Sequence, residues 1–178
     1  MQRIARCLLT LGIAAVAGCA EEGGIAEGAD AVATAGAQDA PVELVGTYRL
    51  VRRELPDGSV LEPPAIVGFM TFTAGHRNFH LYQPGAGGTP SSVSMVATYS
   101  AAGEEYTEST LYEVASNVSE GSGLDYNIPG STFTTPISRS VQNIQFRDTE
   151  TGPMLTFSRD SMVAALDGAF VDRWVRVE

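Results

Sequence analysis

The sequence lacks lysine altogether. Its 11 basic residues are all arginine, and they stand against 21 acidic residues, which gives a formal net charge of −10 at pH 7. An excess of negative charge repels phosphate backbones and anionic surfaces. The composition therefore argues against nucleic acid as a partner.

Cysteine is also scarce, since only Cys7 and Cys19 are present and both fall near the N-terminus. This excludes a disulfide framework or a thiolate zinc site in the rest of the chain. Long apolar runs are missing too. The longest spans residues 7–18, and its 12 residues are too few for a helix that crosses a bilayer.

The first 18 residues have the architecture of a secretory signal peptide. Arg3 and Arg6 form a basic start, and an apolar stretch follows that ends in small residues. Residues 16–19, Val-Ala-Gly-Cys, resemble the lipobox of bacterial lipoprotein precursors. The resemblance implies that Cys19 is lipidated and becomes the first residue of the mature protein. The alternative is an ordinary signal peptide cut near Ala20, with Cys19 incidental.

A lipidated Cys19 would place the protein in the cell envelope and attach it to the membrane through the lipid anchor only. Ala20 rather than aspartate follows the cysteine, which by the same resemblance implies the outer membrane, facing the periplasm. Residues 19–41 are rich in alanine, glycine and acidic residues and contain no aromatic residue. Such a segment cannot bury enough apolar surface to offset its ordering entropy, so we expect a disordered tether.

Residues 42–178 read as strands separated by turn signals. Runs rich in β-branched and aromatic residues recur at short spacing. They cover residues 44–54, 66–73, 77–83, 92–100, 106–115, 138–147, 154–158, 162–166 and 170–177. Residues 161–170 are the best helix candidate, but 162–166 could equally be a strand. The pattern predicts an all-β domain, either a sandwich or an antiparallel barrel.

Three segments resemble the bacterial lipocalin-like domain families. They are Val-Gly-Thr-Tyr-Arg-Leu-Val at 45–51, Gly-Glu-Glu-Tyr-Thr-Glu at 103–108 and Asp-Arg-Trp-Val-Arg-Val at 172–177, in the family's order. The resemblance implies a lipocalin-like barrel of about eight strands, closed by pairing of its first and last strands. The residues assigned to this closure are Gly46, Tyr48, Trp174 and Arg176, with Arg176 packed on the ring of Tyr48.

Strand alternation suggests which side chains face the interior. Between residues 106 and 114 the more aromatic face carries Tyr106, Glu108, Thr110 and Tyr112, so we expect this face to point inward and to contact a ligand. The neighbouring inward candidates are His80, Tyr82 and Tyr99, with Phe79 and Leu81 as the alternative to His80 and Tyr82. Glu108 is then either a buried group satisfied by tyrosine or arginine, or a polar anchor for a ligand.

Recognisable catalytic, cofactor and metal motifs are missing. His76 and His80 are four residues apart, but on a strand they would lie about 13 Å apart and could not share a metal. No cofactor is predicted, and the sequence gives no indication of oligomeric state. The leading hypothesis is a tethered barrel that binds a small apolar or amphiphilic molecule. The alternatives are a side-chain-filled barrel that binds a partner, and a small isomerase or hydrolase that uses Glu108 and His80.

Overall fold

The computed structural model describes residues 42–84, 90–117 and 123–177. These residues belong to one of the chain's two structural units, Gly36–Glu178. The predicted signal peptide (1–18), the predicted tether (19–41) and Cys19 lie outside the described residues.

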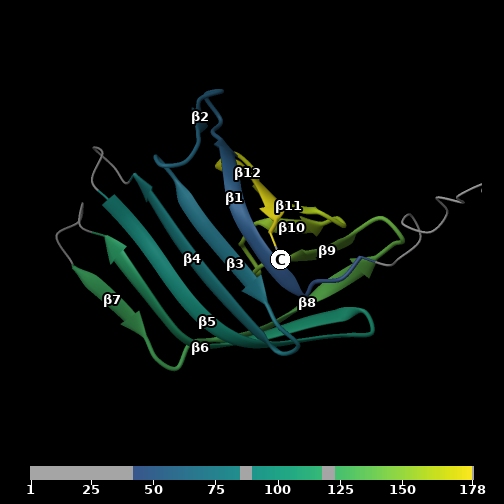
Figure 1. Cartoon of the computed structure of the whole chain (residues 1–178). Helices are drawn as coiled ribbons and strands as arrows, with labels where there is room; N and C mark the ends of the chain where they lie inside the picture. Colours follow the sequence, from purple (N-terminus) through teal and green to yellow (C-terminus); the bar gives the residue numbers. More distant parts are fainter. Residues whose placement is uncertain (1–41, 85–89, 118–122, 178) are drawn as a thin grey trace, which may run out of the picture. The chain divides into compact units, whose positions relative to one another are not determined.

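The described residues form strands and no helix (Figure 1). The strands are β1 (Gly46–Glu54), β2 (Val60–Leu61), β3 (Val67–Phe72), β4 (His76–Pro84), β5 (Pro90–Ala102), β6 (Glu105–Asn117), β7 (Leu124–Asn127), β8 (Thr132–Arg139), β9 (Ile144–Arg147), β10 (Met154–Phe157), β11 (Ser161–Leu166) and β12 (Phe170–Arg176). Correspondingly, no helix able to cross a membrane occurs in this part of the chain.

Ten of these strands form a closed antiparallel barrel. Its order is β1-β3-β4-β5-β6-β8-β9-β10-β11-β12, and β12 pairs with β1 to close the ring. β2 pairs with β1 and β7 pairs with β6 outside the ring. The predicted all-β antiparallel barrel is therefore confirmed. Closure removes the unpaired edges that a ten-stranded open sheet would expose.

The predicted count of about eight strands is wrong. The single strand expected over residues 138–147 is split between β8 and β9 by a turn at Ser140–Asn143. In this turn the Ser140 hydroxyl oxygen accepts hydrogen bonds from the backbone N–H groups of Gln142 and Asn143. The turn contains neither glycine nor proline, which are the strongest local signals of a chain reversal. No strand is predicted between residues 115 and 138, but the structure has β7 and most of β8 there.

The helix candidate at residues 161–170 is not helical: it contains β11 (Ser161–Leu166), a turn and the first residue of β12. Met162 and Ala164 are buried while their neighbours are half-buried, which is the two-residue period of a sheet.

Two β-bulges reverse the inward and outward alternation within a strand. In β6, Leu111 is unpaired, because Val96 lies opposite Tyr112 and Ala97 lies opposite Thr110. In β1, Val51 is unpaired between the pairs Leu50–Trp174 and Arg52–Arg173. Such an extra residue turns the following side chains to the other face of the strand. Arg53 consequently faces the interior and is buried.

Candidate functional site

One end of the barrel, near Leu44 and Arg176, is filled with aromatic rings. We call it the filled half and define it by Tyr48, Phe72, Tyr106, Phe146 and Phe157. The ring centroid of Phe157 lies 5.4 Å from those of Tyr48 and Phe72, both in edge-to-face geometry. Phe146 in turn stacks on Tyr106 at 4.0 Å. Close ring packing of this kind stabilises a core beyond the apolar area it buries.

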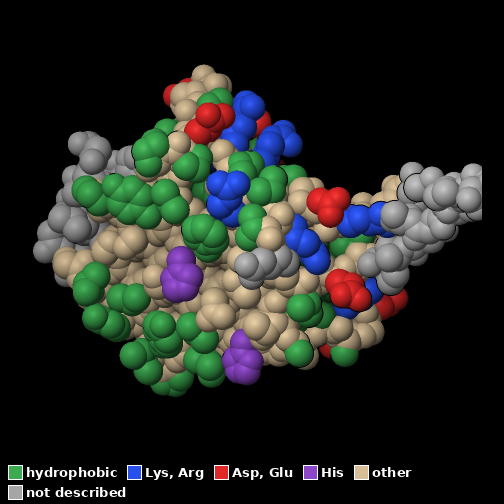
Figure 2. All heavy atoms as spheres, in the orientation of Figure 1, with side chains coloured by type: hydrophobic (Ala, Val, Ile, Leu, Met, Phe, Trp, Pro, Cys, Tyr) green, Lys and Arg blue, Asp and Glu red, His purple; other side chains and the backbone are tan. Residues whose placement is uncertain are grey.

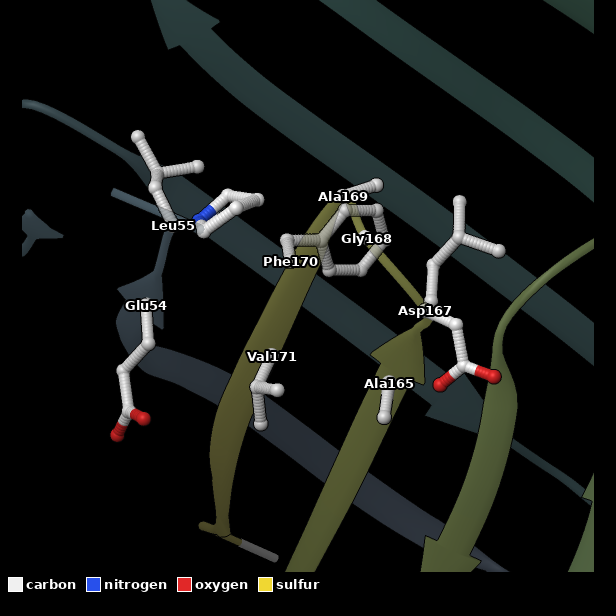
Figure 3. Close-up of a pocket in the computed structure, with 10 residues that line it drawn as sticks. Glu54, Leu55, Ala165, Asp167, Gly168, Ala169, Phe170 and Val171 are labelled. Carbon is white, nitrogen blue, oxygen red and sulfur yellow. The ribbon is translucent and has the colours of Figure 1, made fainter. Parts of the chain in front are cut away.

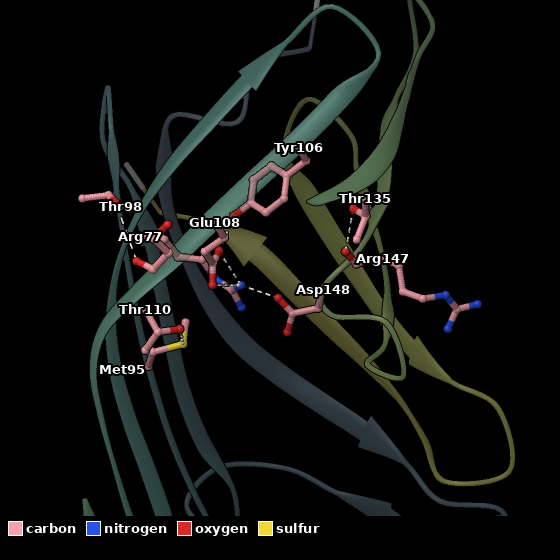
Figure 4. Close-up of polar contacts among 10 residues, drawn as sticks. Arg77, Met95, Thr98, Tyr106, Glu108, Thr110, Thr135, Arg147 and Asp148 are labelled. Atoms are coloured by element: carbon pink, nitrogen blue, oxygen red, sulfur yellow. Dashed lines mark hydrogen bonds and ion pairs between the residues drawn. The ribbon is translucent and has the colours of Figure 1, made fainter. Parts of the chain in front are cut away.

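A cluster of charged side chains lies beside these rings (Figure 4). It consists of the buried Arg77 and Glu108, the half-buried Asp148 and the Tyr106 hydroxyl. Nη1 of Arg77 donates to Oε2 of Glu108 at 3.1 Å and also to Oδ1 of Asp148. The Tyr106 hydroxyl donates to Oε2 of Glu108. Arg77 and Glu108 are each 1% exposed, so these contacts replace their lost hydration.

The cluster shifts the pKa of each of its buried groups. Burial raises the pKa of Glu108, although Arg77 opposes this shift. Burial likewise raises the pKa of Tyr106, whose hydroxyl stays protonated. Burial alone would lower the pKa of Arg77, but the carboxylates of Asp148 and Glu108 outweigh it and raise that pKa. Arg77 therefore stays charged and holds the cluster together.

The other end of the barrel encloses a cavity of about 230 Å³. We call this end the hollow half and define it by Arg53, Phe79, Leu81, Gln83 and Trp174. The cavity wall is largely apolar, and its other members include Met70, Leu155, Ala164 and Phe170. An apolar cavity of roughly 150 Å³ is enough to bind benzene. Apolar walls with a few placed polar groups are typical of small-molecule sites.

Arg53 provides the main polar group of the hollow half. Its Nε donates to Oδ1 of Asp172 at 2.6 Å and its Nη2 donates to Oδ2 at 2.7 Å, a bidentate pair. Its Nη1 donates to Oε1 of Gln83. The guanidinium carbon also lies 4.2 Å from the ring centroid of Phe170. Burial raises the pKa of Asp172, while the hydrogen bonds from Arg53 oppose that shift.

Two smaller cavities share wall residues with the first. One of about 170 Å³ shares Phe79 and Asp148 with it and is also bordered by Glu108 and Glu113. Another of about 200 Å³ shares Leu81 and Gln83. The inner face of β4 thus borders all three spaces. Both smaller cavities are also lined by residues of β5 and β6.

Gly68 on β3 makes room for the indole ring of Trp174. A Cβ atom at this position would lie 2.8 Å from Cη2 of Trp174 and 3.1 Å from Cβ of Leu50. Both distances are shorter than van der Waals contact. The glycine therefore sets how far the indole ring can recede from the cavity.

Three of the predicted ligand-facing residues point inward as expected, namely Tyr106, Glu108 and Thr110, and all three are buried. Glu108 is held by Arg77 and Tyr106, so the geometry favours the first of its two interpretations, a buried group satisfied by its partners. Tyr99 packs 5.3 Å from Phe72, and its hydroxyl donates to the Thr73 carbonyl. It belongs with the filled half and does not border the 230 Å³ cavity.

The inward placement of Tyr112 is wrong. Tyr112 is 39% exposed because the bulge at Leu111 reverses the alternation of β6. Beyond the bulge Glu113 lines the 170 Å³ cavity in its place. The aromatic pattern predicted the correct face only up to Thr110.

The inward placement of His80 and Tyr82 is also wrong, and the alternative pair Phe79 and Leu81 faces the cavity instead. His80 is exposed and bonds to Ser94 on the outer face, while Tyr82 is 43% exposed. Glu108 and His80 therefore lie on opposite faces of the sheet, and the acid–base pair on which an enzyme would depend is not formed. Among the described residues no cluster of three or more His, Cys, Asp or Glu side chains could hold a metal ion.

The residues assigned to barrel closure lie where β1 meets β12. Tyr48 pairs with Arg176, whose guanidinium carbon is 5.1 Å from the Tyr48 ring centroid and whose Nη2 donates to the hydroxyl at 2.6 Å. Gly46 begins β1 with a φ of 151°, an angle that favours glycine. Trp174 lies opposite Leu50 and reaches into the hollow half.

Sequence reasoning missed the polar groups of the hollow half, which are Arg53, Gln83 and Asp172. Arg53 lies next to Arg52 in a strand with apparent alternation, and only the bulge at Val51 turns it inward. Asp172 shares a face with Trp174, and that two-residue spacing was an available signal. A charged residue on the face of a buried tryptophan predicts a buried partner of opposite charge.

A separate surface depression of about 250 Å³ borders the turn between β11 and β12 (Figure 3). Its two carboxylates, Glu54 and Asp167, lie on opposite sides and do not form a pair. Glu54 is bound instead by Arg173 at 2.9 Å and Arg52 at 3.4 Å.

On the face shown in Figure 2, most charged side chains lie toward the top and right, and most hydrophobic side chains lie toward the left and bottom. One row across β3 to β7 consists of Phe69, His80, Ser94, Val114 and Tyr126, all uncharged apart from the titratable histidine. The arginines and acidic residues visible in this view lie outside the area where the hydrophobic side chains gather. The outer face of β3 to β7 is therefore a nearly uncharged surface with exposed aromatic rings.

No family model matches the chain, and no curated protein or solved structure does either. The resemblance to bacterial lipoproteins and lipocalin-like domains therefore stays a prediction. The function has to be argued from the geometry of the barrel.

Proposed function

We propose that this protein binds a small, largely apolar or amphiphilic molecule in the hollow half of its barrel, in the cell envelope. The observation that supports the proposal is the cavity of about 230 Å³, walled by apolar side chains and bordered by the Arg53–Asp172 pair. We further propose that a lipid on Cys19 tethers the barrel to the outer membrane. This attachment follows from the lipobox resemblance.

The apolar wall supplies the affinity in this proposal. Burial of apolar surface contributes about 25 cal/mol per Å², and the cavity presents Phe79, Leu81 and Trp174 for that contact. The polar groups supply orientation. Arg53 is already fixed by Asp172, Gln83 and the Phe170 ring before a ligand arrives. A preorganised polar group loses little conformational freedom when a ligand binds.

Two neighbouring alanines of β11 provide a matched test. Ala164 is buried and lines the cavity, whereas Ala165 belongs to the opposite face of the strand. A neutral apolar fluorescent probe titrated into the wild type should show saturable binding. Ala164→Leu should weaken this binding about tenfold or more by filling the cavity, and Ala165→Leu should leave it unchanged. Absence of saturable binding by the wild type, or equal effects of both variants, would contradict the proposal.

The lipid anchor has its own test. Cys19→Ser should leave an unprocessed precursor and abolish partitioning of the protein into detergent. A variant that still fractionates with membranes after alkaline washing would show that Cys19 is not the anchor.

A partner-binding lipoprotein is the second candidate, and the outer face of β3 to β7 favours it. Phe69, Tyr82 and Tyr126 are 40%, 43% and 66% exposed on this face, and exposed apolar side chains grouped together often mark interaction sites. The double variant Phe69→Ser, Tyr82→Ser should abolish crosslinking to a partner in the envelope and leave probe binding intact. Unchanged crosslinking would exclude this face.

A further inference from the structure

The hollow half contains a buried hydrogen-bond donor without an acceptor. Trp174 is 2% exposed and lines the 230 Å³ cavity, and its indole Nε1–H has no hydrogen-bond partner. Buried donors in native proteins are nearly always paired. An unpaired donor on a residue of a cavity wall therefore indicates that a ligand supplies the acceptor.

Gln83 offers a second donor to the same space. Its Oε1 accepts from Arg53, so its amide NH₂ is what it can present to the cavity. Within the described part of the chain this NH₂ has no acceptor. The half-buried NH₂ of Gln83 and the buried N–H of Trp174 are thus both donors available to a ligand.

The charges around the cavities exclude an anionic acceptor. Carboxylates of Asp148, Asp172, Glu108 and Glu113 border the 230 and 170 Å³ cavities, against the two guanidinium groups of Arg53 and Arg77. Both arginines are engaged by those carboxylates. With four carboxylates against two guanidinium groups, a carboxylate or phosphate ligand would be repelled in a poorly screened interior.

We infer that the ligand is an uncharged compound with an apolar body and a carbonyl oxygen, such as a ketone, ester or amide. This inference depends on the proposed function and narrows its ligand class. A carbonyl oxygen has two lone pairs and can accept from Trp174 and Gln83. An amine would be attracted by the carboxylates around the cavity. It would bring further hydrogen-bond donors, however, and would leave the N–H of Trp174 and the NH₂ of Gln83 without an acceptor.

Trp174 is the only tryptophan of the chain, so it reports on this site alone. Four ligands of similar size separate the alternatives when titrated into the purified full-length chain: 2-octanone, octane, octanoate and octylamine. We expect 2-octanone to bind about fivefold or more tightly than octane. The single indole N–H resonance should move downfield with 2-octanone and not with octane. Octanoate should show no saturable binding.

Calorimetry of Trp174→Phe isolates the donor, because the variant keeps an aromatic ring and loses the N–H. In this variant the preference for 2-octanone over octane should disappear, because the lost apolar contact weakens both ligands alike and the lost N–H weakens only the ketone. If Trp174→Phe does not fold, Gln83→Met serves instead, because it removes the amide NH₂ donor. This variant should also reduce the preference for 2-octanone over octane.

Two results would overturn the inference in distinguishable ways. If octane, octanoate or octylamine binds as tightly as 2-octanone, the ligand class is wrong and the proposed binding function stands. If none of the four ligands binds, the proposed function fails together with the inference.

Discussion

The two halves of the barrel use the same ten strands and differ in the side chains that fill them. In the filled half Phe157 is fully buried and touches three other rings. In the hollow half Phe79 is only partly buried, and its ring centroid lies 6.3 Å from that of Trp174 beside an open cavity. One end of the barrel is therefore packed with aromatic rings, while the other leaves a largely apolar cavity.

Both halves bury polar groups at a cost to stability. The hollow half buries the Arg53–Asp172 pair and an indole N–H without an acceptor, and the Arg77–Glu108 pair is buried beside the filled half. Buried ion pairs often contribute no more stability than apolar side chains of similar volume. Sites that trade stability for function commonly carry such features.

The largest expected effect comes from a pair of phenylalanines, one in each half. Phe157→Ala should lower the free energy of unfolding by about 3–5 kcal/mol, because it opens a void among packed rings. Phe79→Ala should cost only about 1–2 kcal/mol, because it enlarges a space that already exists. Chemical denaturation measures both. Equal costs would show that the two halves are packed alike.

The buried ion pair gives the next effect. Asp172→Asn should lower the free energy of unfolding by about 3 kcal/mol, since Arg53 would stay buried without its carboxylate. The double variant Arg53→Met, Asp172→Leu should recover most of that loss. If the double variant is as unstable as the single one, the Arg53–Asp172 pair stabilises the fold more than apolar side chains would. The buried pair would then not lower the stability of the hollow half.

Gly68→Ala should have a smaller effect. The new Cβ would push the indole ring of Trp174 toward the cavity, at a cost of about 1–2 kcal/mol. Because the cavity accepts the displaced ring, the intrinsic fluorescence of Trp174 should change as well. Gly75→Ala is the control, since a Cβ there meets no atom within 4 Å. An unchanged fluorescence spectrum in Gly68→Ala would mean that the ring has no room to move.

The smallest effect concerns pH. Burial raises the pKa of Glu108 above its unfolded value, so the folded protein holds this proton more tightly than the unfolded chain does. The contribution of Glu108 is fully present below the unfolded pKa and declines as pH rises through the folded pKa. The free energy of unfolding of the wild type, minus that of Glu108→Gln, should therefore decrease from about pH 4 toward neutral pH. A difference that grows with pH would mean that Arg77 outweighs burial.

The sequence was sufficient to predict the barrel but not the direction of every side chain. Turn residues and alternation located most strands, because glycine, proline and β-branched residues act locally. The bulges at Val51 and Leu111 leave no comparable local signal, and each reverses a strand. That is why Tyr112 was placed inward and Arg53 was overlooked.

The choice at β4 failed for a related reason. His80 and Tyr82 alternate with Phe79 and Leu81, and both faces carry a ring, so alternation alone could not decide between them. The partner strand decides it, because Met70 and Phe79 lie opposite each other on the inner face. Such pairings depend on register between strands, which a single sequence does not contain.

Native mass spectrometry of the protein extracted from its own membrane tests the central claim most directly. The account predicts one small, uncharged molecule that copurifies with wild type and with Ala165→Leu and is absent from Ala164→Leu. A wild-type protein that carries no small molecule, or an Ala164→Leu variant that carries the same one, would contradict the assignment of binding to the hollow half.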